Sequence, residues 1–509
     1  MKLFKIVLNI SLLTFLSRIF GFLRDILLAF KVGAGANSDI LFIALKIPNL
    51  FRRIFAEGAF SQAFIPSFCA LLVNKSQKIA LDFANNVIYY FLISLFLLVV
   101  IIEIFMPQFI YIFAYGYRDN AEVITLSRFA FPYIIFISAV TVINAVLNSL
   151  KIFIIGSLMP IIYNISIILS IFLLIGLDTK IAVIYGVVFS GILQLTLIYF
   201  YARKRNIILV PTKPKKSSKE LKKLVKKLMP GVFSASIIQL NSWVDIMIAS
   251  FIPGAVSYLY YSDRIIQLPL ALIAIAITTA ILPFLSKNIS KKQYKEANKI
   301  FFNSIELSCF FVLPAMIGLF SLNEQIIMTI YGYGEFNISA IKATSDILAI
   351  FALALPAFVL SKILLTCFYA RENFNSPLKI SLFTLFLNLV LNIILVQYFS
   401  YLGIALATLI SAWINVFILT ILICKNNYSN LEYFSARKFI KIILLGVCFF
   451  FTVNISSYSI PSFIDLGLSD KYFYLFITII ANIIIYFILS TIFKLYNFRE
   501  IKKVIFCKN

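Results

Sequence analysis

The chain has 509 residues, of which 62% are hydrophobic and 13% are charged, and its formal net charge is +24. This composition excludes an ordinary soluble domain and predicts an all-α polytopic membrane protein, whose charged residues are confined to loops or to functional sites. The sequence contains no histidine, which excludes histidine-based acid–base catalysis and histidine zinc sites.

Apolar runs of about 18 to 28 residues predict about fourteen transmembrane helices. Their centres lie near residues 16, 52, 94, 136, 166, 190, 240, 273, 314, 356, 387, 411, 447 and 481. If the chain begins in the cytoplasm, the inner loops hold most of the Lys and Arg, as the positive-inside rule requires. We therefore expect both termini to be cytoplasmic, and we interpret the high positive charge as an orientation signal with no nucleic-acid partner.

The first two predicted helices carry charged residues in the middle of apolar sequence. If a helix begins near Lys2, Arg18 lies roughly 24 Å along it, deep in a hydrocarbon core about 30 Å thick. A guanidinium near the bilayer centre costs at least about 2.5 kcal/mol unless it faces water, a counter-ion or a ligand. The charges that matter here lie between Ser17 and Glu57 and include Arg18, Arg24, Asp25, Asp39, Lys46, Arg52, Arg53 and Glu57.

Two interpretations of these charges are open. In the first, Asp25, Asp39 and Glu57 neutralise the arginines, and the resulting ion pairs only hold helices together. In the second, the excess of arginine binds a ligand with two or more negative charges. Arginine suits a phosphate, because its planar fork matches phosphate oxygens bidentately. On a helix Arg24 points about 120° away from the face that Arg18 and Asp25 share, so the first helix offers cations to more than one neighbour.

Four pairs of segments recur in the same order about 220 residues apart. They are residues 24–29 with 244–249, 46–48 with 267–269, 64–66 with 281–283, and 115–117 with 331–333. Such a duplication predicts two parallel six-helix repeats around a central cavity, followed by two additional helices. The predicted domains are an N-terminal bundle at 1–202, a basic amphipathic cytoplasmic linker at 203–227, a C-terminal bundle at 228–425, and the added helices with a basic tail at 426–509.

The second repeat carries fewer charges in its corresponding helices. Arg264 would extend the cationic cluster across the cavity. Asp245, with Asn388 and Asn392 one turn apart on one helix face, could offer oxygen ligands to a sodium ion. The alternative is that these asparagines only form hydrogen bonds between helices. No cofactor is expected apart from this possible Na⁺.

The charged N-terminal segments carry a family resemblance. Residues 16–25, then Asp39, then residues 48–61 and 64–66, resemble the signature of the MurJ (MviN) lipid II flippases, and the similarity continues through 260–269 and over nearly all the chain. That family belongs to the multidrug/oligosaccharidyl-lipid/polysaccharide exporter superfamily. The resemblance implies a transporter rather than an enzyme, located in the bacterial inner membrane and needed for cell wall biogenesis.

The resemblance also implies a substrate and a set of residues that bind it. The substrate would be lipid II, an undecaprenyl-pyrophosphate-linked disaccharide-pentapeptide, moved by alternating access by a chain working as a monomer among membrane lipids. Arg18, Arg24, Arg52 and Arg264 match the positions expected to bind it, supported by ion pairs of Asp25, Asp39, Arg53 and Glu57. The chain offers fewer carboxylates at the possible sodium site than the family's proposed sodium binders, so the membrane potential is an alternative energy source.

Three other functions compete with this prediction. The same fold could export another polyprenyl-linked saccharide, or it could be a cation-coupled drug exporter. A drug exporter handles cations, and would be expected to place acids rather than four arginines in its N-terminal cavity. A membrane-embedded glycosyl or phosphoglycosyl transferase would need clustered Asp and Glu on its loops, whereas the inner loops here are predominantly basic.

Overall fold

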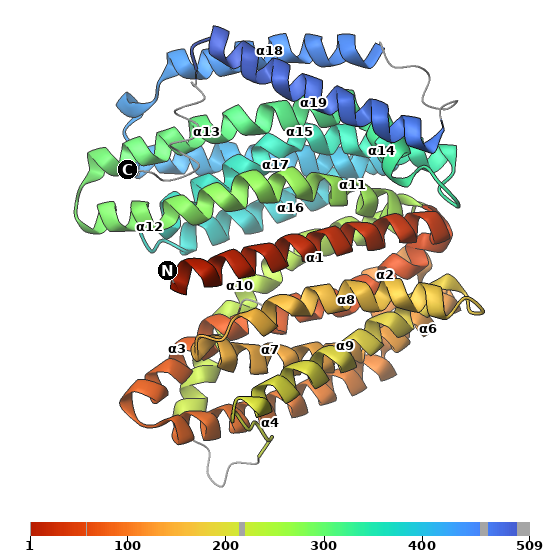
Figure 1. The fold of residues 1–509 in the computed structure, drawn as a ribbon, viewed down its shortest axis with the longest axis vertical. Helices are drawn as coiled ribbons and strands as arrows, with labels where there is room; N and C mark the ends of the chain where they lie inside the picture. Colours follow the sequence, from red (N-terminus) through yellow and green to blue (C-terminus); the bar gives the residue numbers. More distant parts are fainter. Residues whose placement is uncertain (1, 57–58, 213–218, 459–466, 496–509) are drawn as a thin grey trace. The chain divides into compact units, whose positions relative to one another are not determined.

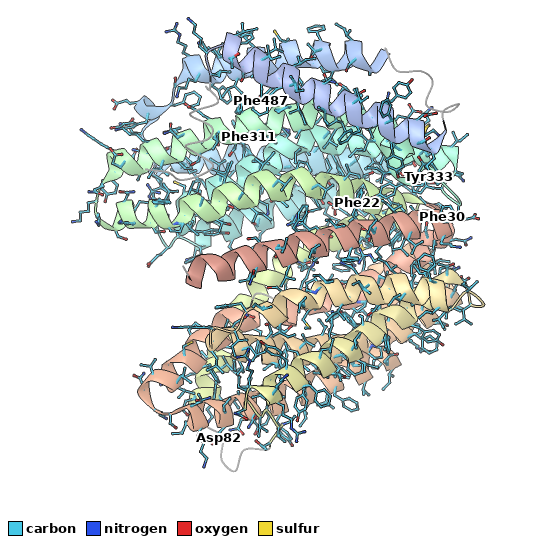
Figure 2. All side chains as sticks on the ribbon, viewed as in Figure 1. Phe22, Phe30, Asp82, Phe311, Tyr333 and Phe487 are labelled. Atoms are coloured by element: carbon cyan, nitrogen blue, oxygen red, sulfur yellow. The ribbon has the colours of Figure 1, made fainter. Side chains whose placement is uncertain are left out.

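The computed structural model describes residues 2–56, 59–212, 219–458 and 467–495, and every regular element in these segments is a helix (Figure 1). The chain divides into two compact units, Met1–Ser257 and Tyr258–Asn509. Polar and apolar side chains are distributed as in a membrane protein. Phe30, labelled in Figure 2, is 45% exposed, whereas Asp39 and Asn392 are fully buried. This pattern agrees with helices that face lipid and keep their polar groups inside.

In the first unit, long helices pack around α8 and α9. α1 packs against α8, α8 against α9, α7 against α9, and α2 against α6. The elements are α1 (Lys2–Val32), α2 (Ala36–Phe51), the π-helix η1 (Arg52–Ala56), α3 (Ala59–Asn74), α4 (Gln77–Ile104), α5 (Met106–Phe113), the 3₁₀ turn η2 (Tyr115–Tyr117), α6 (Ala121–Ala130), α7 (Tyr133–Ser149), α8 (Ile154–Leu173), α9 (Thr179–Lys204) and α10 (Lys219–Ala249).

The second unit begins within α11, repeats part of this organisation and adds two helices. α16 packs against α17, α15 against α13 and α17, and the added α18 packs against α13 and α19. The elements are α11 (Ala255–Leu270), the π-helix η3 (Ala271–Ile275), α12 (Ala276–Ser290), α13 (Tyr294–Ser321), α14 (Asn323–Tyr331), α15 (Ile338–Tyr369), α16 (Asn375–Phe399), α17 (Tyr401–Lys425), the 3₁₀ turn η4 (Leu431–Tyr433), α18 (Ala436–Tyr458) and α19 (Leu468–Ile492).

A helix, or a helix interrupted by a π-helical or 3₁₀ segment or a turn, lies at each of the fourteen predicted centres. Within the described residues, eleven helices are long and apolar enough to cross a membrane. The centres near 16, 52 and 240 fall in α1, in η1 between α2 and α3, and in α10, which are not among these eleven. These three segments carry most of the predicted site residues. The all-α polytopic fold is thereby confirmed.

The internal repeat is visible element by element. α4 and α13 begin at Gln77 and Tyr294, which are 217 positions apart, and the short helices α5 and α14 begin at Met106 and Asn323 with the same spacing. The second span of each repeat is broken in the same way. η1 follows Pro48 in α2, and η3 follows Pro269 at the end of α11. A proline removes one helical hydrogen bond, and π-helical turns occur frequently at functional positions.

The boundary between the compact units does not coincide with the boundary of the repeats. α10, the first helix of the predicted C-terminal bundle, packs against α3, η1 and α5 and so belongs to the first unit. The predicted linker also contacts this unit: Lys75 forms an ion pair with Glu220 at 2.9 Å, and the Asn85 side chain accepts a hydrogen bond from the Val210 N–H at 3.0 Å. The domain bounds derived from the repeat remain a prediction, because repeats and compact units need not share an edge.

Candidate functional site

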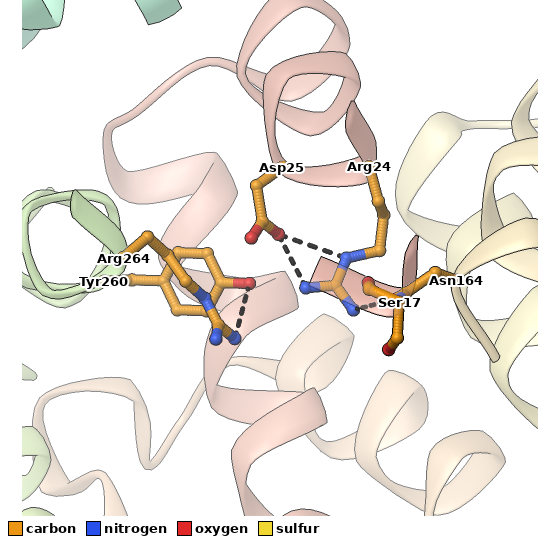
Figure 3. Close-up of polar contacts among 6 residues, drawn as sticks. All are labelled: Ser17, Arg24, Asp25, Asn164, Tyr260 and Arg264. Carbon is orange, nitrogen blue, oxygen red and sulfur yellow. Dashed lines mark hydrogen bonds and ion pairs between the residues drawn. The ribbon is translucent and has the colours of Figure 1, made fainter. Parts of the chain in front are cut away.

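Arg24 and Asp25 form a buried ion pair on α1. Arg24 donates from Nε and from Nη2 to Asp25 Oδ1, at 3.1 and 2.7 Å, and the two residues are 8% and 3% exposed. Neighbouring positions on a helix do not normally face each other, but the long arginine side chain turns back to reach the carboxylate (Figure 3). For this arginine the structure shows the neutralising ion pair that the sequence left as one of two interpretations.

Arg24 also contacts α8. Its Nη1 donates to Asn164 Oδ1 at 2.9 Å, and the centre of the guanidinium lies 5.7 Å from the centroid of the Tyr163 ring. Asn164 in turn donates to the Ser17 carbonyl at 3.1 Å. Asn164 and Tyr163 are functional candidates that the sequence analysis missed. An asparagine within the apolar run centred near 166 was the available signal.

Arg18, Arg52 and Arg53 lie at less buried positions of the same unit. Arg18 is exposed on α1, while Arg52 and Arg53 are the first two residues of η1, where Arg52 is partly exposed and Arg53 is exposed. Glu57, predicted to form a supporting ion pair, lies outside the described residues. The convergence of these arginines on one ligand remains a prediction, as does the supporting role of Arg53.

Asp39 is fully buried at the first turn of α2 and accepts three hydrogen bonds. They come from the backbone N–H groups of Gly254 and Ser257, both at 2.7 Å, and from the Tyr117 hydroxyl at 3.0 Å. Gly254 has φ 88°, a left-handed conformation that suits glycine, and α11 begins at the next residue. The carboxylate therefore binds the N-terminus of α11, a natural anion site.

The contacts of Asp39 differ from the ion pair that the resemblance implied, because its described partners are neutral donors. A second hydrogen bond from a backbone N–H joins the loops next to Asp39. The Gly116 N–H donates to the Ser250 hydroxyl at 3.0 Å, and a Cβ at Gly116 would lie only 1.8 Å from the Ser250 carbonyl oxygen. The repeated Tyr-Gly-Tyr segment, noted in the sequence only as a repeat, thus contributes both Tyr117 and a close backbone approach.

In the second unit, Arg264 is held by its own helix. Its Nη2 donates to the Tyr260 hydroxyl at 3.1 Å, and the centre of its guanidinium lies 4.7 Å from the centroid of the Tyr260 ring (Figure 3). The two residues are four positions apart on α11, so they face the same side. A cation held against an aromatic ring keeps its full charge, and it can still bind an anion.

The three residues of the possible sodium site are divided between the units. Asp245 lies on α10 in the first unit, and Asn388 and Asn392 are buried on α16 in the second. Asn392 Nδ2 donates to Asn388 Oδ1 at 3.0 Å. This contact joins two residues of one helix, so it does not test the alternative of hydrogen bonds between helices. Sodium binding by these residues remains a prediction.

The chain is similar to known proteins over most of its length. The family model described as "Lipid II flippase MurJ" matches residues 28–493. A probable lipid II flippase MurJ of Buchnera aphidicola subsp. Baizongia pistaciae is 33% identical over 84% of this chain and 85% of its own length, and one of Rickettsia prowazekii is 35% identical over 82% and 83%.

Solved structures give the same result. A lipid II flippase MurJ in an inward closed conformation is 28% identical, covers 95% of this chain and 98% of its own, and has a TM-score of 0.79. An inward-facing multidrug MATE transporter of the MOP superfamily shares the fold, with a TM-score of 0.65 at 15% identity over 81% of this chain and 94% of its own. From the family match and the identity of the curated relatives, this chain belongs to the MurJ family of lipid II flippases.

Proposed function

We propose that this chain flips lipid II across the bacterial inner membrane by alternating access, and so supplies precursor for peptidoglycan synthesis. Its family membership supports this function, as does its polytopic helical fold. The chain acts as a transporter and not as an enzyme: its substrate crosses the membrane without covalent change. It works as a monomer, with both termini in the cytoplasm, where the basic inner loops lie.

The observation that carries the proposal is the set of arginines on membrane helices of the first unit. α1 holds Arg18 and Arg24, and η1 holds Arg52. Arg24 is paired with Asp25, and Arg18 and Arg52 add further positive charge to the same unit. Charge of this sign within a membrane protein is expected to serve an anionic ligand. The pyrophosphate of lipid II provides that ligand, and arginine matches its oxygens bidentately.

Arg264 supplies a fourth cation from the second repeat in this proposal. Three arginines on one repeat and one on the other would let the headgroup bring the repeats together, so that ligand binding favours a closed state. The membrane potential then drives transport, at about 2.3 kcal/mol per charge per 100 mV. Sodium coupling through Asp245, Asn388 and Asn392 is the alternative energy source.

The other functions fit these residues less well. A cation-coupled drug exporter could share the fold. The sequence identity to the MATE transporter is 15%, however, so that likeness concerns the fold alone. An arginine-rich site would repel cationic drugs. An exporter of another polyprenyl-linked saccharide would use the same pyrophosphate contacts, so the identity of the saccharide must be measured directly.

The test is to identify the lipid that the protein carries. The full chain is purified in mild detergent from a peptidoglycan-producing host, and co-purifying lipids are identified by mass spectrometry. The proposal predicts lipid II in the wild-type sample and its loss in a variant with Arg18, Arg24 and Arg52 all changed to Ala. Enrichment of a different polyprenyl-linked saccharide, or equal lipid II in both samples, would contradict it.

A further inference from the structure

The Asn164 side chain joins α8 to α1 through both ends of its amide. Asn164 is 6% exposed, accepts from Arg24 Nη1 at 2.9 Å and donates to the Ser17 carbonyl at 3.1 Å (Figure 3). The orientation of the amide is dictated by its partners, because a guanidinium can only donate and a carbonyl can only accept. One buried residue thus fixes the Arg24 side chain relative to the backbone of its own helix.

The surface of α1 is shaped to receive this amide. Gly21 lies one turn after Ser17, and a Cβ added there would lie 3.3 Å from Asn164 Nδ2. A glycine lets the amide approach the helix closely enough to bond a carbonyl that already serves the helix backbone. The Tyr163 ring, next along α8, lies 5.7 Å from the centre of the same guanidinium. Two successive residues of α8 therefore contact the Arg24 guanidinium.

Two of the described partners of Arg24, Asp25 and Asn164, differ in charge. Asp25 receives both Nε and Nη2 and balances the charge of the guanidinium, whereas Asn164 receives Nη1 without adding negative charge. A second carboxylate at position 164 could still accept from Arg24, but it could not donate to the Ser17 carbonyl and would make the group anionic as a whole. An amide of this size orients the guanidinium without adding a negative charge that would repel a phosphate.

We infer that Asn164 is a positioning residue for pyrophosphate recognition, holding the Arg24 guanidinium so that a lipid diphosphate can bind it and a second arginine together. This inference rests on the proposed function. A monophosphate can be bound by one cation, but a diphosphate benefits from two cations held at a fixed separation. Asn164 therefore affects the preference for diphosphate over monophosphate, and not lipid binding in general.

The experiment compares two lipids on the full chain. Undecaprenyl diphosphate and undecaprenyl monophosphate are titrated against the protein in nanodiscs, and the ratio of their affinities is measured by native mass spectrometry. Wild type should prefer the diphosphate. Asn164→Ala should lower the preference by about tenfold, the effect of one charge-assisted hydrogen bond. Asn164→Asp should lower it at least as much, while its carboxylate still contacts Arg24.

Ser170→Ala is the matched control, because Ser170 is also buried on α8 and the hydrogen bond described for its hydroxyl goes to the Ile167 carbonyl of its own helix. It should leave the ratio unchanged. Asn164→Asp should keep an acceptor for Arg24, so the lipid preference can still be measured on this variant if Asn164→Ala does not fold. A wild-type preference that both variants retain would overturn the positioning role, and an equal loss for both lipids would show a structural role instead. No preference in wild type would count against the proposed function itself.

Discussion

The Tyr486 hydroxyl of α19 donates a hydrogen bond of 2.6 Å to the Phe310 carbonyl of α13. That carbonyl lacks its usual helical donor, because the residue four positions later is Pro314, which has no N–H. Tyr486 is 2% exposed, and its ring also packs against Phe310 with centroids 5.2 Å apart. A proline in one helix thus creates the acceptor by which an added C-terminal helix docks.

Tyr486→Phe should therefore destabilise the protein while keeping the aromatic contact. Removing the hydroxyl leaves a buried carbonyl without this donor, at a cost of about 1 kcal/mol. Thermal unfolding of the purified protein in detergent measures the change as a lower midpoint. Tyr474→Phe is the control, since Tyr474 lies on the same helix with 37% exposure. Equal midpoints for wild type and Tyr486→Phe would show that the hydrogen bond contributes nothing.

Asp39→Asn should loosen the start of α11. The carboxylate accepts three hydrogen bonds, and an amide of the same size has one acceptor fewer and two unwanted donors. The loss of about 2 kcal/mol should raise the hydrogen-exchange rates of the Gly254 and Ser257 amides roughly tenfold or more. Asp119→Asn, at a side chain that is 89% exposed, serves as the control. Unchanged exchange at both amides would rule out this role for Asp39.

The arginines give a functional prediction. Arg18→Ala, Arg24→Ala and Arg52→Ala should each abolish complementation of a lipid II flippase deficiency while the protein still inserts. The corresponding lysine variants should rescue poorly, because lysine keeps the charge but loses the bidentate fork. Arg118→Ala is the matched control, because Arg118 pairs with Asp119 at an exposed position. Full complementation by the three alanine variants would exclude an arginine ligand site.

The fold could be predicted from the sequence because its signals are strong and local. Runs of apolar residues mark the membrane helices, and the four recurring segments identify the duplication by their order and their similar spacing of about 220 residues. The interruption of the second and eighth spans was not predicted. Pro48 and Pro269 were visible, but the formation of a π-helix after each depends on packing that the sequence does not display.

The sequence identified which charged residues belong to the candidate site, but it did not predict which groups they contact. The intramembrane charges identified Arg24 and Asp25, but helical geometry alone placed their side chains on different faces, whereas the flexible arginine bends back to the carboxylate. Two of the three donors to Asp39, the Gly254 and Ser257 N–H groups, come from backbone more than 200 positions away in the chain. Such contacts between a side chain and a distant helix terminus leave no local pattern in the sequence.

Orientation in the membrane can be tested by thiol labelling in a variant without the native cysteines. Ser38, near the predicted outer end of the second span, is fully buried and bonded to the Gly35 backbone, so the exposed Asn37 is the better labelling position there. A cysteine at Asn37 or Glu335 should react with an impermeant reagent from outside, and one at Lys223 should not. Labelling of the Lys223 variant in intact cells would show that the protein has the opposite orientation.

The most direct measurement is transport of lipid II by the purified chain. Fluorescent lipid II is placed in both leaflets of proteoliposomes, and its accessibility to an external quencher is followed before and after a membrane potential is imposed. We predict that wild-type protein moves lipid II between leaflets, that the potential changes its distribution, and that Arg52→Ala vesicles behave like protein-free vesicles. Movement at the same rate in wild-type, Arg52→Ala and protein-free vesicles would contradict flipping by this chain.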